Sequence, residues 1–600
     1  MYTVFGIKYI SQTQKGGVFM DVLFVTPTDK PGLSHEVNGT MLLATKLLQE
    51  GYDTDILRFY QSEAFGVNYS AFIGHITAQI LEKDPRCVSV YTLWPSFHVM
   101  LRIAHSIKAA APHIPIVMGG PLVSLMAEEL MTAIPWVDYV CCGEGENTIV
   151  PFIRALLGDR RFDSVPGLYY RSGSSVSRGP QSIPLCDLDT IPPWDNRLLR
   201  ADPRAEEDIG SPYYYMPIDV GRGCPYNCSF CCTSRFWLHN YRLKSPEKIL
   251  DEIRHYHDNF GIRSFLFSHD AFTSNKKLVA DVCDRIIASD LRISWSCTTR
   301  ADCVNEALVL KMKESGLTQL QLGVETGSAR MQKLIHKNLD LNTVQNLVAF
   351  LLKEKIALSL FFMYGFPEET EEDLKDTLNL VFTFLDMGVQ NVSMSYCNFS
   401  PATQITNEQF DKLVFDPDAV IASNKIFGFA EEIPMIREHK ELFPFFYHLN
   451  TPLRDEFMHI NQLVGAYRRI PGIGQILRQL YNRDDLQLYR DFVQNNANHF
   501  ARQTYSAETD ALQLSYTLLR NTAKGLQHPR LPQITALFEF LYDVRKIAAS
   551  GEDRALRKAY AFSYLDYTRK KPLEQYSDGQ SEILIEKVAG KTKFRILDIR

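Results

Sequence analysis

Three cysteines in one short loop constrain this chain of 600 residues more than any other feature. Cys224, Cys228 and Cys231 follow the apolar run 213–220 with the spacing C-x3-C-x2-C, so their thiolates can converge on one face of an iron–sulfur cluster. A fourth cysteine would close a four-iron cluster for electron transfer, whereas three leave one iron free to bind a substrate or cofactor. The loop therefore predicts a 4Fe-4S cluster that takes part in chemistry.

A structural zinc ion or a group of buried free cysteines would also account for this loop. Zinc prefers four ligands in paired C-x2-C spacing. The nearest other thiol, that of Cys232, is adjacent to Cys231 and is poorly placed to share its metal. The iron–sulfur interpretation is therefore favoured over both.

The loop, with Phe230 before its third cysteine, resembles the signature of the radical SAM superfamily. In that family S-adenosylmethionine (SAM) binds the fourth iron, the reduced cluster donates one electron to the sulfonium, and a 5'-deoxyadenosyl radical forms. The cofactor performs the difficult step and the protein positions it. The resemblance implies an external electron donor such as flavodoxin or ferredoxin.

Length and composition indicate several domains of ordinary globular character. A chain of 600 residues exceeds what one core organises, so about three domains are expected. The net charge of -6 gives no basic surface for a nucleic-acid partner. No apolar run reaches the roughly 18 residues of a membrane span, and the first residues lack the pattern of a signal peptide. We expect a cytoplasmic protein, whose reducing compartment suits thiolate ligands.

The distribution of the twelve cysteines limits the number of clusters. Cys397 is the last cysteine, so residues 398–600 cannot supply a thiolate. An auxiliary cluster in a C-terminal extension is therefore not expected.

Strand and helix patterns alternate from residue 20 to about 160, after an N-terminal extension (1–19) to which no role is assigned. Parallel neighbours need right-handed helical crossovers, so the pattern predicts a doubly wound, Rossmann-like sheet of five parallel strands. Ligands bind such sheets beyond the carboxyl ends of the strands. The predicted strands are 21–26, 53–58, 87–91, 115–118 and 138–142.

Two glycine turns at these strand ends carry a second resemblance. The order Gly119-Gly120-Pro121, then Gly143-Glu144-Gly145-Glu146, resembles the cobalamin-binding domain in front of many radical SAM cores, and the resemblance covers the whole segment 20–160. Glycines there let a bulky ligand approach the backbone. The cobalamin-binding residues implied are Thr26, Thr92, Trp94, Gly119, Gly120, Gly143, Glu144 and Gly145.

The mode of cobalamin binding is also implied. His35 lacks the Asp-x-His-x-x-Gly context that ligates cobalt in other cobalamin folds, so cobalamin is expected base-off, without a histidine ligand. Trp94 would lie near its lower face, although an aromatic at a strand end also serves as packing. An empty fold with mere tight turns is the alternative.

A second alternating region follows a linker (161–210) that contains a hairpin with a Gly/Ser turn. The region 211–420 predicts a partial (βα)6 barrel, whose chemistry should sit at the carboxyl ends of its strands. Ser245 and Pro246 form a helix entry signal between the first two strands. The predicted strands are 213–220, 264–268, 293–298, 319–324, 358–363 and 392–398.

The ends of these strands match the SAM-binding positions of the radical SAM family. The loop after strand two would meet the SAM amino group, Arg300 offers a fork for its carboxylate, and Glu325 resembles the ribose-binding carboxylate. Each residue alone is a weak signal, but the order at successive strand ends is a strong one. The SAM-binding residues implied are Phe230, Ser268, Asp270, Thr298, Arg300, Glu325 and Gly365.

The last region, 421–600, predicts a mainly helical domain that caps the barrel and selects the substrate. Its aromatic segments, such as 443–449 and 537–542, are expected to be core rather than pocket. It closes with strand-like segments at 583–587 and 593–597.

The order of the two cofactor domains resembles the cobalamin-dependent radical SAM enzymes. The most common outcome that this resemblance implies is methyl transfer, in which the adenosyl radical removes hydrogen from an unactivated carbon and methylcobalamin supplies the methyl group. No catalytic residue beyond the cluster and cofactors is assigned. The substrate can be a small molecule, a lipid or a peptide.

Two other functions stay open at this point. The same two-domain plan supports ring formation, rearrangement or oxidation, with cobalamin as a redox partner. A cobalamin-binding sensor without catalysis is a more distant alternative, because it leaves the cysteine loop and the ordered strand ends unexplained.

Overall fold

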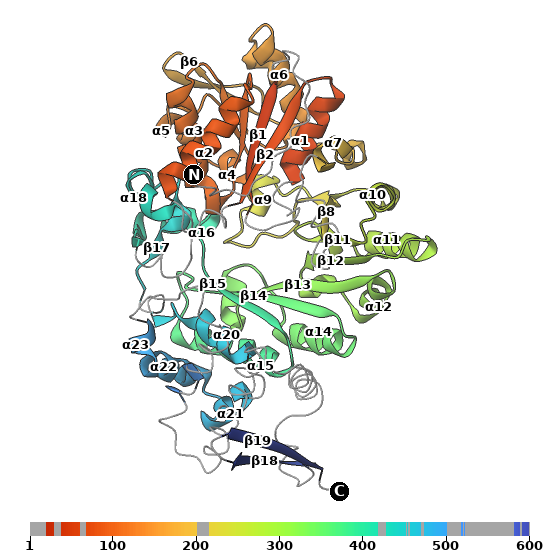
Figure 1. Ribbon diagram of the computed structural model, residues 1–600, viewed down its shortest axis with the longest axis vertical. Helices are drawn as coiled ribbons and strands as arrows, with labels where there is room; N and C mark the ends of the chain where they lie inside the picture. The colour runs from red at the N-terminus through yellow and green to blue at the C-terminus, as the bar shows by residue number, and fades with distance from the viewer. Residues whose placement is uncertain are drawn as a thin grey trace. The chain divides into compact units, whose positions relative to one another are not determined.

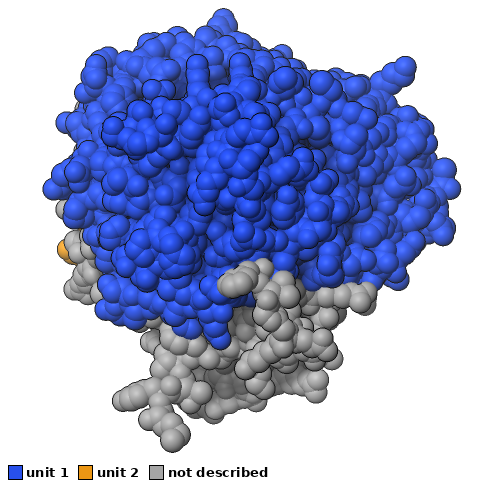
Figure 2. Space-filling view, turned by 90° about the horizontal axis from the view of Figure 1, so that it is seen from above, with its two compact units in different colours: residues 1–373, 394–458 blue, residues 374–393, 459–600 orange. Residues whose placement is uncertain are grey.

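The computed structural model describes residues 20–28, 38–60, 68–200, 215–417, 428–451, 453, 456–469, 473–500, 518–519, 521–522, 581–588 and 591–598. The expected N-terminal extension and His35 lie outside these residues. The chain divides into two compact units, the first made of residues 1–373 and 394–458, and the second of 374–393 and 459–600 (Figure 2). Within the described residues, no helix combines the length and the apolar composition needed to cross a membrane.

The first unit begins with a sheet in the order β2-β1-β3-β4-β5-β6-β7, whose first five strands are parallel (Figure 1). This confirms the predicted doubly wound sheet. The hairpin expected in the linker is β6–β7, which pairs antiparallel with β5 and extends the sheet to seven strands. The strands are β1 (Val22–Thr28), β2 (Thr54–Tyr60), β3 (Val88–Tyr91), β4 (Ile116–Gly119), β5 (Tyr139–Cys141), β6 (Leu168–Ser172) and β7 (Ser175–Arg178).

Helices flank this sheet and bury its central strands (Figure 1). In β1, Val22, Leu23 and Val25 are completely buried, as expected for a parallel strand covered on both faces. The helices are α1 (Asn38–Gln49), α2 (Tyr69–Glu82), α3 (Phe97–Ala110), α4 (Pro121–Ser124), α5 (Ala127–Ala133) and α6 (Ile149–Leu157).

The second sheet has the order β15-β14-β13-β12-β11-β8 and confirms the predicted six-stranded partial barrel. Ser245 caps the first barrel helix, accepting the N–H of Lys248 at 3.1 Å, and Gly261 ends that helix in the left-handed conformation. The strands are β8 (Met216–Asp219), β11 (Ser264–Ser268), β12 (Ser294–Thr299), β13 (Leu317–Glu325), β14 (Ala357–Tyr364) and β15 (Asn391–Tyr396). The helices are α9 (Thr233–Phe236), α10 (Pro246–Phe260), α11 (Lys276–Ala288), α12 (Glu306–Glu314), α13 (Ala329–Leu334), α14 (Leu341–Lys353) and α15 (Glu371–Asp386).

A segment that follows the barrel returns to the first sheet. Helix α18 (Phe429–Glu438) contacts α3, where Arg102 forms a bidentate ion pair with the buried Glu432, with both N–O distances 2.7 Å. The ring of Phe443 packs on Phe97 with 5.2 Å between centroids, and Phe446 packs on His98. These aromatics are buried core, as predicted, but their core is shared with the N-terminal sheet.

The second unit is helical in most of its described part. Its helices are α20 (Ile460–Arg469), α21 (Ile473–Leu480), α22 (Asp485–Asn495) and α23 (Ala497–Phe500). The buried Arg478 joins α21 to Asp485 of α22 at 2.9 Å and to Asp386 at 2.7 Å. The predicted C-terminal strands form an antiparallel hairpin, β18 (Ser581–Val588) with β19 (Lys591–Asp598).

Two glycines with positive φ give a matched test of the barrel packing. Gly316, at the start of β13, has a φ of 105°, and a Cβ there would overlap the carbonyl oxygen of Ile293. Gly261 has a φ of 67° and open space around it. We predict that Gly261→Ala lowers the free energy of unfolding by about 1 kcal/mol. Gly316→Ala should cost more than about 3 kcal/mol, because strain and overlap add.

Urea unfolding followed by tryptophan fluorescence measures both losses, since the buried Trp295 contacts Gly316. Equal losses in the two variants would contradict the packing described for Gly316.

Candidate active site

The cysteine loop lies between two short strands at the start of the barrel. Strand β9 (Gly221–Arg222) continues from β8 and pairs antiparallel with β10 (Arg242–Leu243). The backbone N–H of Cys231 donates to the carbonyl of Cys228 at 3.1 Å, which closes a tight turn within the loop. The ribbon of β9 and β10 therefore anchors both ends of the loop at the carboxyl end of the first barrel strand.

The three thiols of this loop are neighbours and are partly buried. Burial raises the pKa of Cys224 to about 11, and the nearby thiols of Cys231 and Cys228 add to the rise. Within the described part of the chain, no three His, Cys, Asp or Glu side chains converge closely enough to hold a single metal ion. Three soft thiols on one loop suit an iron–sulfur cluster, in which each cysteine binds a different iron.

Two cationic side chains lie beside Cys228. The Arg300 Nη1 lies 4.0 Å from the Cys228 Sγ, and the Arg300 guanidinium carbon lies 3.7 Å from the centroid of the Tyr226 ring. The bidentate edge of Arg300, expected to hold the SAM carboxylate, instead engages Asp302 at 3.0 and 2.8 Å. Burial raises the pKa of Cys228, and the positive charges of Lys337 and Arg300 oppose this rise, in favour of the thiolate that an iron ligand requires.

The backbone of Glu325 is strained. Its φ is 71°, in the left-handed region, where the register between β13 and β14 shifts. The buried Lys337 donates to the Glu325 Oε1 at 3.0 Å and holds the carboxylate in place. Strained backbone of this kind concentrates at functional sites, which supports the sequence prediction for Glu325.

A cavity of about 690 Å³ separates the first sheet from the barrel. The carboxyl ends of β3, β4 and β5 line one side, and those of β8, β11 and β12 line the other. Three predicted SAM-binding residues line it, namely Ser268, Asp270 and Thr298. The volume lies within the range of ligand pockets, roughly 300 to 1,000 Å³.

The other predicted SAM-binding residues do not line this cavity. Phe230 packs on Phe366, with 6.0 Å between ring centroids. The N–H of Gly365 donates to the carboxylate of Glu369. Phe230 belongs to the cysteine loop, and Gly365 follows β14. Arg300 and Glu325 lie at the carboxyl ends of β12 and β13.

Five of the predicted cobalamin-binding residues line the cavity: Gly119, Gly120, Gly143, Glu144 and Gly145. Gly120 is required by the protein itself, because a Cβ would lie 2.8 Å from the carbonyl oxygen of Thr92. Thr92 and Thr26 are buried behind the cavity wall. Trp94 is 39% exposed, contacts Phe445 edge-on with 6.1 Å between ring centroids, and is not part of the lining.

Unpartnered polar atoms on the first-sheet side test whether cobalamin fits. The side-chain oxygens of Asn38 and Thr40, at the start of α1, are buried and accept or donate no hydrogen bond. Both residues line the cavity. A ligand rich in amide groups, as the corrin periphery is, would satisfy them, so the residues present fit that group.

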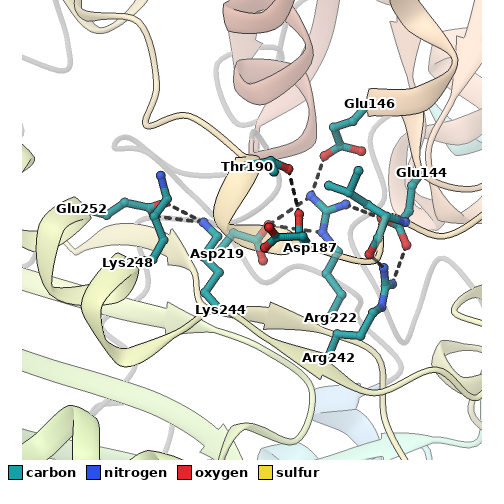
Figure 3. A network of polar contacts seen from close by, with 11 residues as sticks. Glu144, Glu146, Asp187, Thr190, Asp219, Arg222, Arg242, Lys244, Lys248 and Glu252 are labelled. Atoms are coloured by element: carbon teal, nitrogen blue, oxygen red, sulfur yellow. Dashed lines mark hydrogen bonds and ion pairs between the residues drawn. The ribbon is translucent and has the colours of Figure 1, made fainter.

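Among the charged residues around this cavity, the sequence pointed to Glu144 and Asp270 but not to Arg222 or Arg242. Arg222 lies in the Gly-Arg-Gly-Cys run and forms ion pairs with Glu144 at 2.9 Å, Glu146 at 2.5 Å and Asp219 at 3.1 Å (Figure 3). Burial opposes the ionisation of Glu146, but Arg222 outweighs it and lowers the Glu146 pKa. In the sequence, Arg222 is marked only by its place inside a run of small residues. That place does not identify its partners, which lie 76 and 78 positions away.

Burial shifts the pKa values of two further lining residues. Burial lowers the pKa of His269 to about 4, and its Nδ1 accepts the N–H of Ala271 at 2.7 Å, so the ring is neutral near pH 7. Burial raises the pKa of Asp270 to about 6. The barrel side of the cavity therefore carries a neutral imidazole next to a carboxylate that is still mostly ionised near pH 7.

Glu369 gives a pH-dependent prediction. Burial raises its pKa to about 7, above its ordinary value, and its Oε1 has no partner. The folded state thus favours the protonated form, and stability is lost as the pH rises through about 7. We predict that Glu369→Gln raises the free energy of unfolding by about 2 kcal/mol at pH 8 and changes it little at pH 5.

Urea unfolding at the two pH values measures this difference, with the exposed neighbour Glu368→Gln as the control. A gain at pH 5 equal to that at pH 8 would show that ionisation of Glu369 is not the cause.

The two halves of the cavity match two known families. Residues 26–153 match the B12 binding domain, and residues 218–381 match the radical SAM superfamily. The chain is 28% identical over 391 residues to the uncharacterized methyltransferase PH0819 of Pyrococcus horikoshii, covering 64% of this chain and 81% of that protein.

Another relative and one solved structure are similar to this chain. The anaerobic magnesium-protoporphyrin IX monomethyl ester cyclase of Cereibacter sphaeroides is 25% identical over 368 residues, which cover 58% of this chain and 57% of the cyclase. The chain thus spans little more than half the length of that relative. The fold is similar to that of OxsB, a cobalamin-dependent S-adenosylmethionine radical enzyme solved with aqua-cobalamin and SAM bound. The TM-score is 0.57 at 14% identity, covering 92% of this chain and 84% of that one.

Each family match thus falls on one of the two sheets whose strand ends line the cavity. A radical SAM domain implies a 4Fe-4S cluster with SAM, and a B12-binding domain implies cobalamin. The chain therefore contains a B12-binding domain followed by a radical SAM domain, and its fold is similar to that of a cobalamin-dependent radical SAM enzyme.

Proposed function

We propose that this protein is a methyltransferase that acts on an unactivated carbon, with SAM and base-off methylcobalamin. The observation that carries the proposal is the single cavity into which the glycine turns of the first sheet and the strand ends of the barrel both project. A substrate placed there lies between the two cofactor domains. The name of the relative PH0819, an uncharacterized methyltransferase, supports methyl transfer as the outcome.

The cofactors supply the radical and the methyl group when bound, and the protein supplies position and shelter. Ser268, Thr298 and Gln321 offer hydrogen bonds from the barrel wall. Phe24, Phe236 and Trp237 form apolar parts of the lining, which exclude water from a reaction that water would quench. Holding the reacting carbon between fixed walls makes the transfer effectively intramolecular.

The residues around the cysteine loop have a separate part in the proposal. Cys224, Cys228 and Cys231 would hold the cluster, with Arg300 and Lys337 stabilising the thiolate of Cys228. Glu325 would hold the SAM ribose, in the strained conformation that Lys337 fixes. An external electron donor, such as flavodoxin or ferredoxin, would reduce the cluster.

Ring formation or oxidation is the second candidate function. The 25% identity to the magnesium-protoporphyrin IX monomethyl ester cyclase over 58% of this chain favours it. In that reaction cobalamin would not deliver a methyl group. Following the methyl group of SAM therefore separates the two functions.

Metal content tests the cofactor sites directly. We predict about four iron atoms and one cobalt atom per chain after anaerobic reconstitution with iron, sulfide and hydroxocobalamin. Cys228→Ala should lose the iron and keep the cobalt, because the cavity side that we assign to cobalamin contains none of the three loop cysteines.

The neighbouring thiol provides the matched control for this experiment. Cys232→Ala should keep all the iron, since Cys232 is not one of the three spaced cysteines. Loss of iron in both variants would contradict the assignment of ligands, and iron without cobalt in the parent protein would contradict the cobalamin site.

The reaction class is tested with SAM labelled in its methyl group. With a chemical reductant, the reconstituted protein should form 5'-deoxyadenosine and also transfer label to cobalamin. Cys228→Ala should abolish the 5'-deoxyadenosine. Formation of 5'-deoxyadenosine with no label on cobalamin would overturn methyl transfer in favour of the ring-forming or oxidising function.

A further inference from the structure

We infer that Arg222 is a positioning residue that fixes the glycine turn Gly143–Glu146 of the first domain against the cysteine loop of the barrel. Its Nη1 donates to Glu144 at 2.9 Å and its Nη2 donates to Glu146 at 2.5 Å (Figure 3). The same guanidinium reaches Asp219, at the end of β8, through its Nε at 3.3 Å and its Nη2 at 3.1 Å. One side chain therefore joins both walls of the cavity.

Arg242 repeats this connection from the second strand of the ribbon. Its Nη2 donates to the other oxygen of Glu144, and its Nη1 donates to the carbonyl of Leu185. The N–H of Leu185 in turn donates to the Glu144 Oε2 at 3.1 Å. We call Glu144, Glu146, Asp219, Arg222 and Arg242 the interdomain ion network.

The charged side chains of this network are buried, and burying them carries a free-energy cost. The side chains of Arg222, Glu144 and Glu146 are only 7%, 4% and 10% exposed. Taking such charges out of water consumes most of their mutual attraction, and an apolar replacement of equal shape is often as stable. The best attested use of a buried ionic group is to select one arrangement of the elements that it joins.

The placement of Arg222 shows which arrangement is selected. It stands two residues before Cys224, on the strand that begins the cysteine loop. Glu144 and Glu146 alternate with Gly143 and Gly145 in the turn that lines the opposite wall. A displacement of the turn would separate three charged groups at once, so the two walls have one favoured distance.

The network also reaches a third part of the lining. The guanidinium carbons of Arg222 and Arg242 lie 5.6 and 5.9 Å from the centroid of the Trp237 ring. Trp237 follows α9 and lines the cavity beside Asp270. The same two arginines thus orient an apolar wall as well as the glycine turn.

A second buried ion pair in the same view provides a matched control. Lys244 donates to Glu252 at 2.8 and 3.0 Å, and these side chains are 1% and 5% exposed (Figure 3). Both residues belong to the start of the barrel, next to β10 and in α10, and neither lies in the first domain. The charge of Lys244 also acts on Asp219, but Glu144 and Glu146 are held by Arg222 and Arg242, so we expect loss of this pair to destabilise the barrel and leave the glycine turn in place.

Hydrogen exchange on the full chain tests the inference without reference to the reaction. Arg222→Met should speed exchange of the amides in residues 143–148 by roughly tenfold. In this variant the turn can open locally without first breaking the ion pairs with Arg222. Lys244→Met should speed exchange in α10 and leave residues 143–148 unchanged. Glu146→Gln, which keeps the shape of the side chain, should reproduce part of the Arg222→Met effect if the latter variant folds poorly.

The double variant Arg222→Met with Glu146→Gln decides whether the two groups act together. Its exchange at residues 143–148 should be no faster than that of Arg222→Met alone, since one interaction is lost in either case. Additive effects, or equal exchange at 143–148 in Arg222→Met and Lys244→Met, would overturn the inference. Failure of methyl transfer would leave these measurements, and the positioning role, unaffected.

Discussion

The direction of the parallel strands is the constraint on which the rest of this protein depends. In a parallel sheet all strands end at the same edge, so the loops that can carry chemistry gather there. The first unit contains two such sheets, and the cavity is lined by the carboxyl ends of strands from both. Neither sheet needs to contribute a complete site, because each contributes one wall.

Much of the fold and part of the site follow from local patterns in the sequence. The cysteine spacing, the helix start at Ser245 and the alternation of apolar strands with helices depend on neighbouring residues, and the structure has each of them. The glycine turns were also expected at the cavity. The reason for one of these glycines differs from the predicted one. Gly120 is required by the close approach of the Thr92 carbonyl and not only to leave room for a ligand.

Contacts between distant segments could not be read in this way. Trp94 follows β3 as expected, but its ring contacts Phe445 of the downstream segment, and nothing near Trp94 in the sequence indicates that partner. Arg300 follows β12 as expected, but its Nη2 also donates to the backbone carbonyl of Lys337 at 2.8 Å, 37 positions away. The partners of Arg222 lie in another domain, and an isolated arginine before a cysteine does not reveal them.

The return of the segment 428–451 to the first sheet changes how this architecture can be divided. The N-terminal sheet is covalently joined to the barrel at one end, and its helix α3 is covered by Phe443, Phe446 and α18, which come from beyond the barrel. The boundary of the folding unit therefore does not coincide with a single cut in the chain. Exchange of the cobalamin-type domain between relatives requires two segments to be transplanted together, because either one alone exposes an aromatic surface.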